Sequence, residues 1–147
     1  MSKKNVYVDT NVLVNYFTQQ ADDVKCLNYL FTKVRKEILF TSSLAVVQAV
    51  GILQTKKKNR SAFTREKAVE CIEKIYTKFS IIDLFGNDVK EGTRYENKDV
   101  EDNVHYVLCK KLKCSIIVTN DTSDYSSFWN VVALSPKETA RIRKVIK

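Results

Sequence analysis

Short runs of β-branched and aromatic residues alternate along the chain with longer segments in which apolar residues recur at helical spacing. The runs predict strands at 5–8, 38–41, 79–84 and 115–119, with a fifth at 131–134. The segments between them predict helices at 12–20, 22–36, 44–53, 64–78, 88–97 and 101–112. Ser135 followed by Pro136 begins a last helix, because proline suits the first helical turn. Strands that alternate with helices pair in parallel, so we expect an α/β protein with helices on both faces of one sheet.

The size and charge of the chain narrow its class. Its 147 residues fit a single domain spanning 1–147, and 3 glycines and 1 proline are too few for a linker or a disordered tail. The formal net charge of +8 favours polyanionic partners such as nucleic acid. Charge alone does not say which polyanion is bound.

The first apolar run and the cysteines predict the compartment. Asp9 interrupts the first apolar run, so we see neither the apolar core of a signal peptide nor a run long enough to cross a membrane. The four cysteines lack the CxxC spacing of a zinc site and lie among apolar residues, as reduced and buried thiols do. They are Cys26, Cys71, Cys109 and Cys114. We therefore expect a cytoplasmic protein with no membrane partner.

Acidic residues follow two of the predicted strands. Asp9 ends the first strand, and Asp121 follows the strand at 115–119, with Asp124 three residues later. A third acidic group, 99–102, opens the helix that leads into that second strand. In an open parallel sheet, ligand sites form beyond the carboxyl ends of the strands. If the two strands are neighbours, the carboxylates converge and repel unless a cation lies among them, and all-oxygen ligands suit Mg²⁺ or Mn²⁺.

These residues resemble the three acidic motifs of the PIN-domain nucleases, in the family's order and over nearly the whole chain. The resemblance is carried by Asp9-Thr10-Asn11, by the helix start around Asp102, and by Thr119-Asn120-Asp121 followed by Asp124-Tyr125. It implies a PIN-like three-layer α/β/α sandwich with a parallel sheet of four or five strands. It also implies metal-dependent cleavage of RNA. Small members of the family are often dimers, and many are toxins that an antitoxin protein restrains.

The resemblance assigns roles to individual side chains. Asp9, Asp102 and Asp121 are the expected catalytic residues and hold Mg²⁺ or Mn²⁺, with Asp124 as a further ligand. Other polar residues are expected to orient those ligands or the phosphate by hydrogen bonds. They are Thr10, Asn11, Gln48, Asp99 and Thr119.

Basic residues gather in two stretches that are expected to contact RNA phosphates. The first comprises Lys56, Lys57, Lys58 and Arg60 and continues to Arg65 and Lys67. The second, in the final helix, comprises Lys137, Arg141, Arg143, Lys144 and Lys147. Contacts of this kind give affinity and salt sensitivity rather than sequence preference.

One position departs from the family's pattern. The family usually has a glutamate on the helix after the second strand, where this chain has Gln48. A glutamine oxygen still meets a cation or its bound water, but it adds no negative charge and cannot act as a base. Compensation by Asp124, Asp99 or Glu101 is one outcome. The alternative is a catalytically weakened PIN-like module that binds RNA or a protein partner, in which Gln48→Glu should raise metal affinity or restore cleavage.

Each acidic residue also has a purely structural interpretation. Asp9 and Asp102 suit the first turn of a helix, where side-chain oxygens and negative charge are favourable. Asp121 and Asp124 suit turns. His105, the only histidine, lies within a predicted helix, which favours a packing or surface role over catalysis.

A third class of function is phosphoryl transfer on an aspartate. Haloacid-dehalogenase-like phosphatases have a second acid two residues after the first, where this chain has Asn11. Receiver domains have a phosphoacceptor aspartate at the end of a central strand, whereas Asp83 lies inside its predicted strand. Neither pattern is matched, so the nuclease hypothesis leads.

Overall fold

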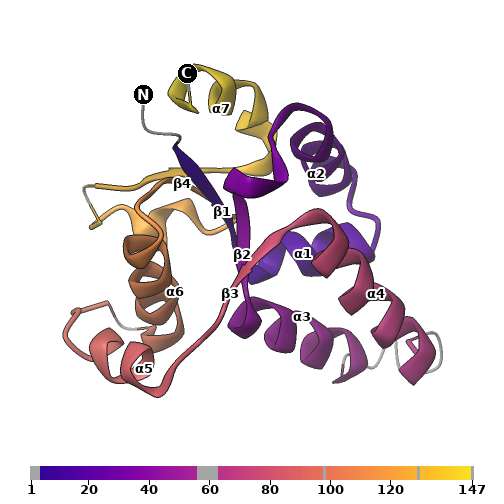
Figure 1. The fold of residues 1–147 in the computed structure, drawn as a ribbon, viewed down its shortest axis with the longest axis horizontal. Coiled ribbons are helices and arrows are strands. Elements are labelled where there is room, and N and C mark those ends of the chain that lie inside the picture. Colours follow the sequence, from indigo (N-terminus) through magenta and orange to yellow (C-terminus); the bar gives the residue numbers. More distant parts are fainter. Residues whose placement is uncertain (1–3, 56–62, 98, 129, 147) are drawn as a thin grey trace.

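A parallel sheet of five strands forms the centre of the structure (Figure 1). The computed structural model describes residues 4–55, 63–97, 99–128 and 130–146. Within these ranges the strands are β1 (Asn5–Val8), β2 (Leu39–Ser42), β3 (Ser80–Ile82), β4 (Cys114–Val118) and β5 (Val132–Leu134). Their order across the sheet is β3-β2-β1-β4-β5, and every neighbouring pair is parallel.

Seven α-helices and three short 3₁₀ turns connect or follow the strands in the described ranges. The helices are α1 (Thr10–Phe17), α2 (Ala21–Lys33), α3 (Ser43–Thr55), α4 (Arg65–Lys78), α5 (Gly86–Gly92), α6 (Val100–Lys111) and α7 (Thr139–Ile146). The 3₁₀ turns are η1 (Lys36–Ile38), η2 (Thr122–Tyr125) and η3 (Pro136–Glu138). None of the helices in the described part of the chain is long and apolar enough to cross a bilayer.

Alternating side chains of the central strand divide the core into two layers. Val6 and Val8 face one cluster, which is completed by apolar residues of α1 to α4 and α7. Tyr7 points to the other face, into a cluster with residues of α6 and the loop after β4. Figure 1 shows the same division, with α5 and α6 on one side of the sheet and α1 to α4 on the other. The expected three-layer α/β/α sandwich is confirmed.

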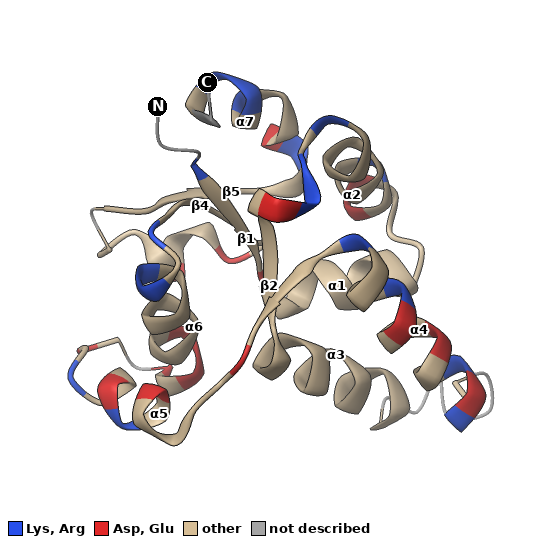
Figure 2. Cartoon of the chain, viewed as in Figure 1, with Lys and Arg blue, Asp and Glu red and all other residues tan. Residues whose placement is uncertain are grey.

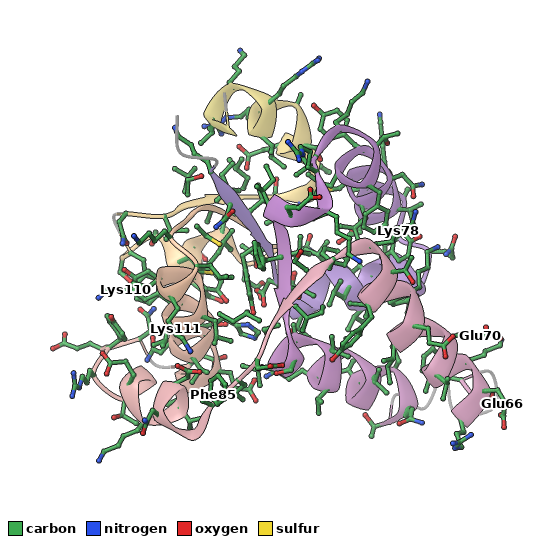
Figure 3. All side chains as sticks on the ribbon, viewed as in Figure 1. Glu66, Glu70, Lys78, Phe85, Lys110 and Lys111 are labelled. Carbon is green, nitrogen blue, oxygen red and sulfur yellow. The ribbon has the colours of Figure 1, made fainter. Side chains whose placement is uncertain are left out.

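α5 is held against α6 by one lysine. The Nζ of Lys111 lies 3.0 Å from Asp88 Oδ1, and it sits 5.1 Å from the centre of the Phe85 ring (Figure 3). Asp88 is buried, and its other oxygen accepts a hydrogen bond from the Phe85 backbone N–H. Gly92 lets the two helices approach closely, since a Cβ there would lie 2.8 Å from Val104 Cγ2.

Several predicted boundaries are wrong for local reasons. The helix expected at 88–97 is α5, which begins at Gly86 because the Asp88 side chain caps its first turn, and ends at Gly92. The strand expected at 79–84 is shorter at both ends: Phe79 is the C-terminal cap of α4, and the Leu84 backbone N–H donates to the Ser43 hydroxyl instead of to a strand. Pro136 begins a 3₁₀ turn rather than the last α-helix, which starts at Thr139.

The topology opens a crevice between the two central strands. The chain leaves β1 into α1, whose apolar residues join the first cluster. It leaves β4 into η2, whose Tyr125 is buried in the second cluster. Adjacent strands that send their following segments to opposite faces create the crevice in which open α/β sheets bind ligands.

Candidate active site

An open cleft of about 500 Å³ lies at the carboxyl ends of β1 and β4. Four segments that are distant in sequence form its walls: the start of α1, the middle and end of α3, the start of α6 and the loop after β4. Its lining residues are Asp9, Thr10, Asn11, Gln48, Gly51, Ile52, Thr55, Asp99, Glu101, Asp102, His105 and Asp121. One wall is therefore acidic, and the wall supplied by α3 is uncharged.

Asp9 lies at the base of the cleft and is only 4% exposed. Its Oδ1 accepts a hydrogen bond from the Thr10 backbone N–H at 2.7 Å, which caps α1. Its Oδ2 accepts from the Thr119 hydroxyl at 2.8 Å. The Asp9 carboxylate thus caps α1 and also lines the cleft. Because of this cap, α1 begins two residues earlier than predicted.

Asn11 and Thr119 tie the ends of β1 and β4 together. The Asn11 amide nitrogen lies 3.4 Å from Asp9 Oδ2 and 3.1 Å from Asp121 Oδ2, so it donates between the two carboxylates. Its oxygen accepts from the Asn120 backbone N–H at 3.0 Å. The Thr119 oxygen in turn accepts from the Asp121 backbone N–H. Both residues therefore hydrogen-bond to carboxylates of the cleft, and their role in orienting metal ligands stays a prediction.

Tyr125 connects Asp9 with the acidic start of α6. Its hydroxyl lies 3.3 Å from Asp9 Oδ2 and 3.3 Å from Asp102 Oδ1. The two carboxylate oxygens are therefore separated by no more than twice that distance. Tyr125 is almost fully buried in η2. The sequence placed it next to Asp124 in the third acidic motif but did not indicate its contacts, because a motif gives neighbours along the chain and not the atoms that meet in space.

The start of α6 concentrates negative charge at the cleft. Asp99 caps the helix by accepting from the backbone N–H groups of Glu101 and Asp102. Burial, followed by the charges of Asp99, Asp9 and Asp124, raises the pKa of Asp102 to about 7. Burial, followed by the charges of Asp124 and Asp9, also raises the pKa of Asp121. The charged forms of these carboxylates repel one another as long as no cation lies beside them.

The donor set fits a hard divalent cation. The described residues that line the cleft include five carboxylates and neither lysine nor arginine, so no side chain there neutralises them. In the described ranges, however, no three His, Cys, Asp or Glu side chains form a ready-made metal cluster. Hydroxyl and amide donors stand between the carboxylates instead.

Gln48 reaches the cleft from α3 and meets His105 from α6. Gln48 Oε1 lies 2.8 Å from the Thr10 hydroxyl oxygen and 2.8 Å from His105 Nε2. His105 is 2% exposed, and its Nε2 is 3.7 Å from Asp9 Oδ1. Burial lowers the pKa of His105, although the neighbouring Asp9 acts in the opposite direction. His105 is thus buried rather than on the surface, with its polar edge in the floor of the cleft.

The remaining predicted site residues lie elsewhere. Asp124 is exposed and does not line this cleft; it borders a neighbouring depression together with Asp99 and Asp102. Its charge contributes to the raised pKa values of Asp102 and Asp121. The basic residues Lys56, Lys57, Lys58, Arg60 and Lys147 lie outside the described residues. The basic α7 is at the end of the molecule beside the N-terminus, away from α3 and the start of α6 (Figure 2). There Lys137 pairs with Asp22.

Fold and site together define a class: a parallel α/β sandwich with a cluster of carboxylates at the crevice between its two central strands. Residues 6–144 match the model of the PIN domain, and the chain belongs to this family. Ribonuclease VapC1 of Aquifex aeolicus (strain VF5) is 28% identical to it over 131 residues, which cover 86% of this chain and 88% of that protein.

Solved structures confirm the fold. A toxin-antitoxin complex from Klebsiella pneumoniae superimposes with a TM-score of 0.65 at 13% identity, covering 90% of this chain and 98% of that one. The sarcin-ricin loop cleaving toxin VapC20 of Mycobacterium tuberculosis gives a TM-score of 0.63 at 11% identity, covering 84% and 95%. At such identities the similarity concerns the fold alone.

Proposed function

We propose that this protein is a divalent-metal-dependent endoribonuclease that hydrolyses RNA phosphodiester bonds and serves as the toxin of a toxin-antitoxin pair. The observation that carries the proposal is the common cleft of Asp9, Asp102 and Asp121, which come from three distant parts of a PIN-domain chain. The relative VapC1 is a ribonuclease by name, and similar folds occur in toxin-antitoxin complexes.

In this proposal Asp9, Asp102 and Asp121 hold Mg²⁺ or Mn²⁺. When bound, the cation would supply activation of a water molecule and neutralise charge on the phosphate. Asn11 and Thr119 keep the side chains of Asp9 and Asp121 oriented through the hydrogen bonds described above. Asp124 is a weaker candidate ligand, because it borders the neighbouring depression.

RNA is proposed to approach along α3. Gly51, Ile52 and Thr55 form the uncharged wall of the cleft, and the basic stretch 56–60 follows Thr55 directly in sequence. The proposed contacts of this stretch to RNA phosphates come from Lys56, Lys57, Lys58 and Arg60. An antitoxin protein and a second copy of the chain are the further proposed partners, and a cytoplasmic location stays a prediction.

A catalytically weakened module that binds RNA or a protein is the second candidate, and Gln48 favours it. The glutamine lines the cleft without adding the charge that a glutamate would bring. Such a module would bind RNA with little cleavage in Mg²⁺ or Mn²⁺.

RNA cleavage by the purified protein tests the proposal. We expect turnover with Mg²⁺ or Mn²⁺ that disappears in excess EDTA and falls at least 100-fold in Asp9→Asn and in Asp121→Asn. Glu73→Gln is the matched control, because it removes one negative charge from an exposed position on α4 outside the cleft. Undiminished cleavage in both aspartate variants would refute the assigned site, and binding without cleavage in the wild type would favour the weakened module.

A further inference from the structure

The carbonyl oxygen of Gln48 is fully engaged inside the protein. It accepts one hydrogen bond from the Thr10 hydroxyl at 2.8 Å and one from His105 Nε2 at 2.8 Å. An amide oxygen has two lone pairs, so neither is left for a cation. The amide nitrogen of Gln48 has no hydrogen-bond partner among the described residues, and the side chain lines the cleft.

A buried chain of hydroxyl groups accounts for this orientation. The Tyr7 hydroxyl lies 2.6 Å from His105 Nδ1 and 2.7 Å from Ser42 Oγ, and all three residues are buried. Because Gln48 Oε1 only accepts, His105 Nε2 carries the proton. His105 Nδ1 then accepts from Tyr7, which itself accepts from Ser42. Each of these hydrogen bonds then has one donor and one acceptor, and all of them run in the same direction from Ser42 to Gln48.

We propose that Gln48 is a substrate-binding residue whose amide N–H groups donate to a phosphate oxygen of RNA, and that His105 is the positioning residue that turns them toward the cleft. The inference rests on the proposed function and deepens it. Gln48 stands on the uncharged α3 wall of the cleft that also holds the carboxylates, where a phosphodiester held near a cation still presents free oxygens. A neutral donor binds these oxygens without competing for the metal.

The opposite orientation of the amide makes the opposite prediction. If Gln48 directed its oxygen into the cleft as a metal ligand, its nitrogen would donate to His105 Nε2. The proton of His105 would then have to lie on Nδ1, and the direction of the Tyr7 and Ser42 hydrogen bonds would reverse. The tautomer of His105 therefore reports which atom of Gln48 faces the cleft.

This tautomer can be measured directly, because His105 is the only histidine of the chain. Long-range ¹H–¹⁵N correlation spectra of the metal-free protein at pH 7.5 should show a protonated Nε2 and an unprotonated Nδ1. A protonated Nδ1 would overturn the proposal. The measurement needs neither metal nor RNA, so its outcome does not depend on whether the protein proves to be a nuclease.

Binding of RNA tests the role of Gln48 itself. Anisotropy of a labelled single-stranded RNA, measured with Mg²⁺ in an Asp121→Asn background that prevents cleavage, should give a Kd at least tenfold higher for Gln48→Glu. Gln48→Met, which lacks donors but adds no charge, should weaken binding by a smaller factor. Val47→Ala, at an exposed position on α3 outside the cleft, is the control. Unchanged RNA affinity together with a tenfold gain in Mn²⁺ affinity for Gln48→Glu would overturn the proposal.

A double-mutant cycle tests His105 as a positioning residue. His105→Phe should raise the Kd for RNA in the Gln48 background but have little further effect once Gln48 is replaced by methionine. In the cleavage assay the effect of His105→Phe should appear in KM more than in kcat. Equal and additive losses in both backgrounds would indicate a merely structural histidine and refute this role.

Discussion

Asp102→Asn should make the metal-free protein more stable, although it removes a residue of the proposed site. Asp102 lies among carboxylates at the start of α6, and its pKa is raised from 3.8 to about 7 by burial and by the charges of Asp99, Asp9 and Asp124. A carboxyl group that holds its proton more tightly in the folded state than in the unfolded state opposes folding once it ionises. Asparagine keeps the oxygen that accepts from Tyr125 and removes the charge.

The size of the effect follows from the pKa. Each pKa unit corresponds to about 1.4 kcal/mol, so the full difference approaches about 4 kcal/mol at pH 8. Asp102 is only partly buried, and solvent screens its charge, so we expect a gain of about 1–2 kcal/mol. For a chain of this size, that gain corresponds to a rise in Tm of roughly 3–6 °C.

The sign depends on pH in a defined window. Below about pH 4, Asp102 is protonated in both states and the variant should gain nothing. The destabilisation of the wild type grows as the pH rises from 4 to about 7, and it is complete above this range. Urea unfolding of wild type and Asp102→Asn at pH 4.5 and pH 8, with Glu73→Gln as the control for loss of one exposed charge, measures the difference.

Divalent cations should reverse the ranking. A ligand that binds only the folded protein stabilises it by about 2.7 kcal/mol at 100 times its Kd, and the proposed site loses a ligand in the variant. Wild type should therefore gain more stability from Mg²⁺ or Mn²⁺ than Asp102→Asn does. A variant that is no more stable than wild type at pH 8, or that gains as much stability at pH 4.5 as at pH 8, would contradict the destabilising role of the Asp102 charge.

Three further predictions concern individual side chains. Tyr125→Phe removes the hydroxyl shared by Asp9 and Asp102 and should lower the free energy of unfolding by about 1–2 kcal/mol at pH 8, measured by urea denaturation; an unchanged value would contradict the bridging role. The lowered pKa of His105 means that the unfolded chain binds a proton that the folded chain refuses, so stability should fall as the pH drops below 6.5. This part of the pH dependence should be absent in His105→Gln. An identical slope of unfolding free energy against pH in the variant and the wild type would contradict the prediction. Lys113→Gly should raise the free energy of unfolding by roughly 1 kcal/mol, because Lys113 has a φ of 52°, which glycine adopts without steric cost. A lower free energy of unfolding would show that the Lys113 side chain stabilises the fold by more than its backbone conformation costs.

The alternation of strands and helices predicted much of this protein, because burial of apolar residues at spacings of 2 and 3.6 is a local property. The runs at 5–8 and 115–119 indicated strands that the structure confirms, and their carboxyl ends indicated where acidic residues would gather. Helix ends were predicted less well. The cap at Asp9 and the capping contact of Asp88 depend on which backbone N–H group a side chain reaches, and spacing does not encode this.

The interior of the cleft was decided by tertiary structure. Tyr7 and His105 belong to no motif, and Tyr125 belongs to one that does not indicate its contacts, because each role is recognisable only by the atoms the side chain meets from other elements. Gln48 shows the same limit: its sequence position suggested a weakened metal ligand, whereas the structure engages its oxygen with Thr10 and His105. The sequence determines which groups are available, but the direction of each hydrogen bond is set by donors and acceptors that only the packing of β1, α3 and α6 brings within hydrogen-bonding distance.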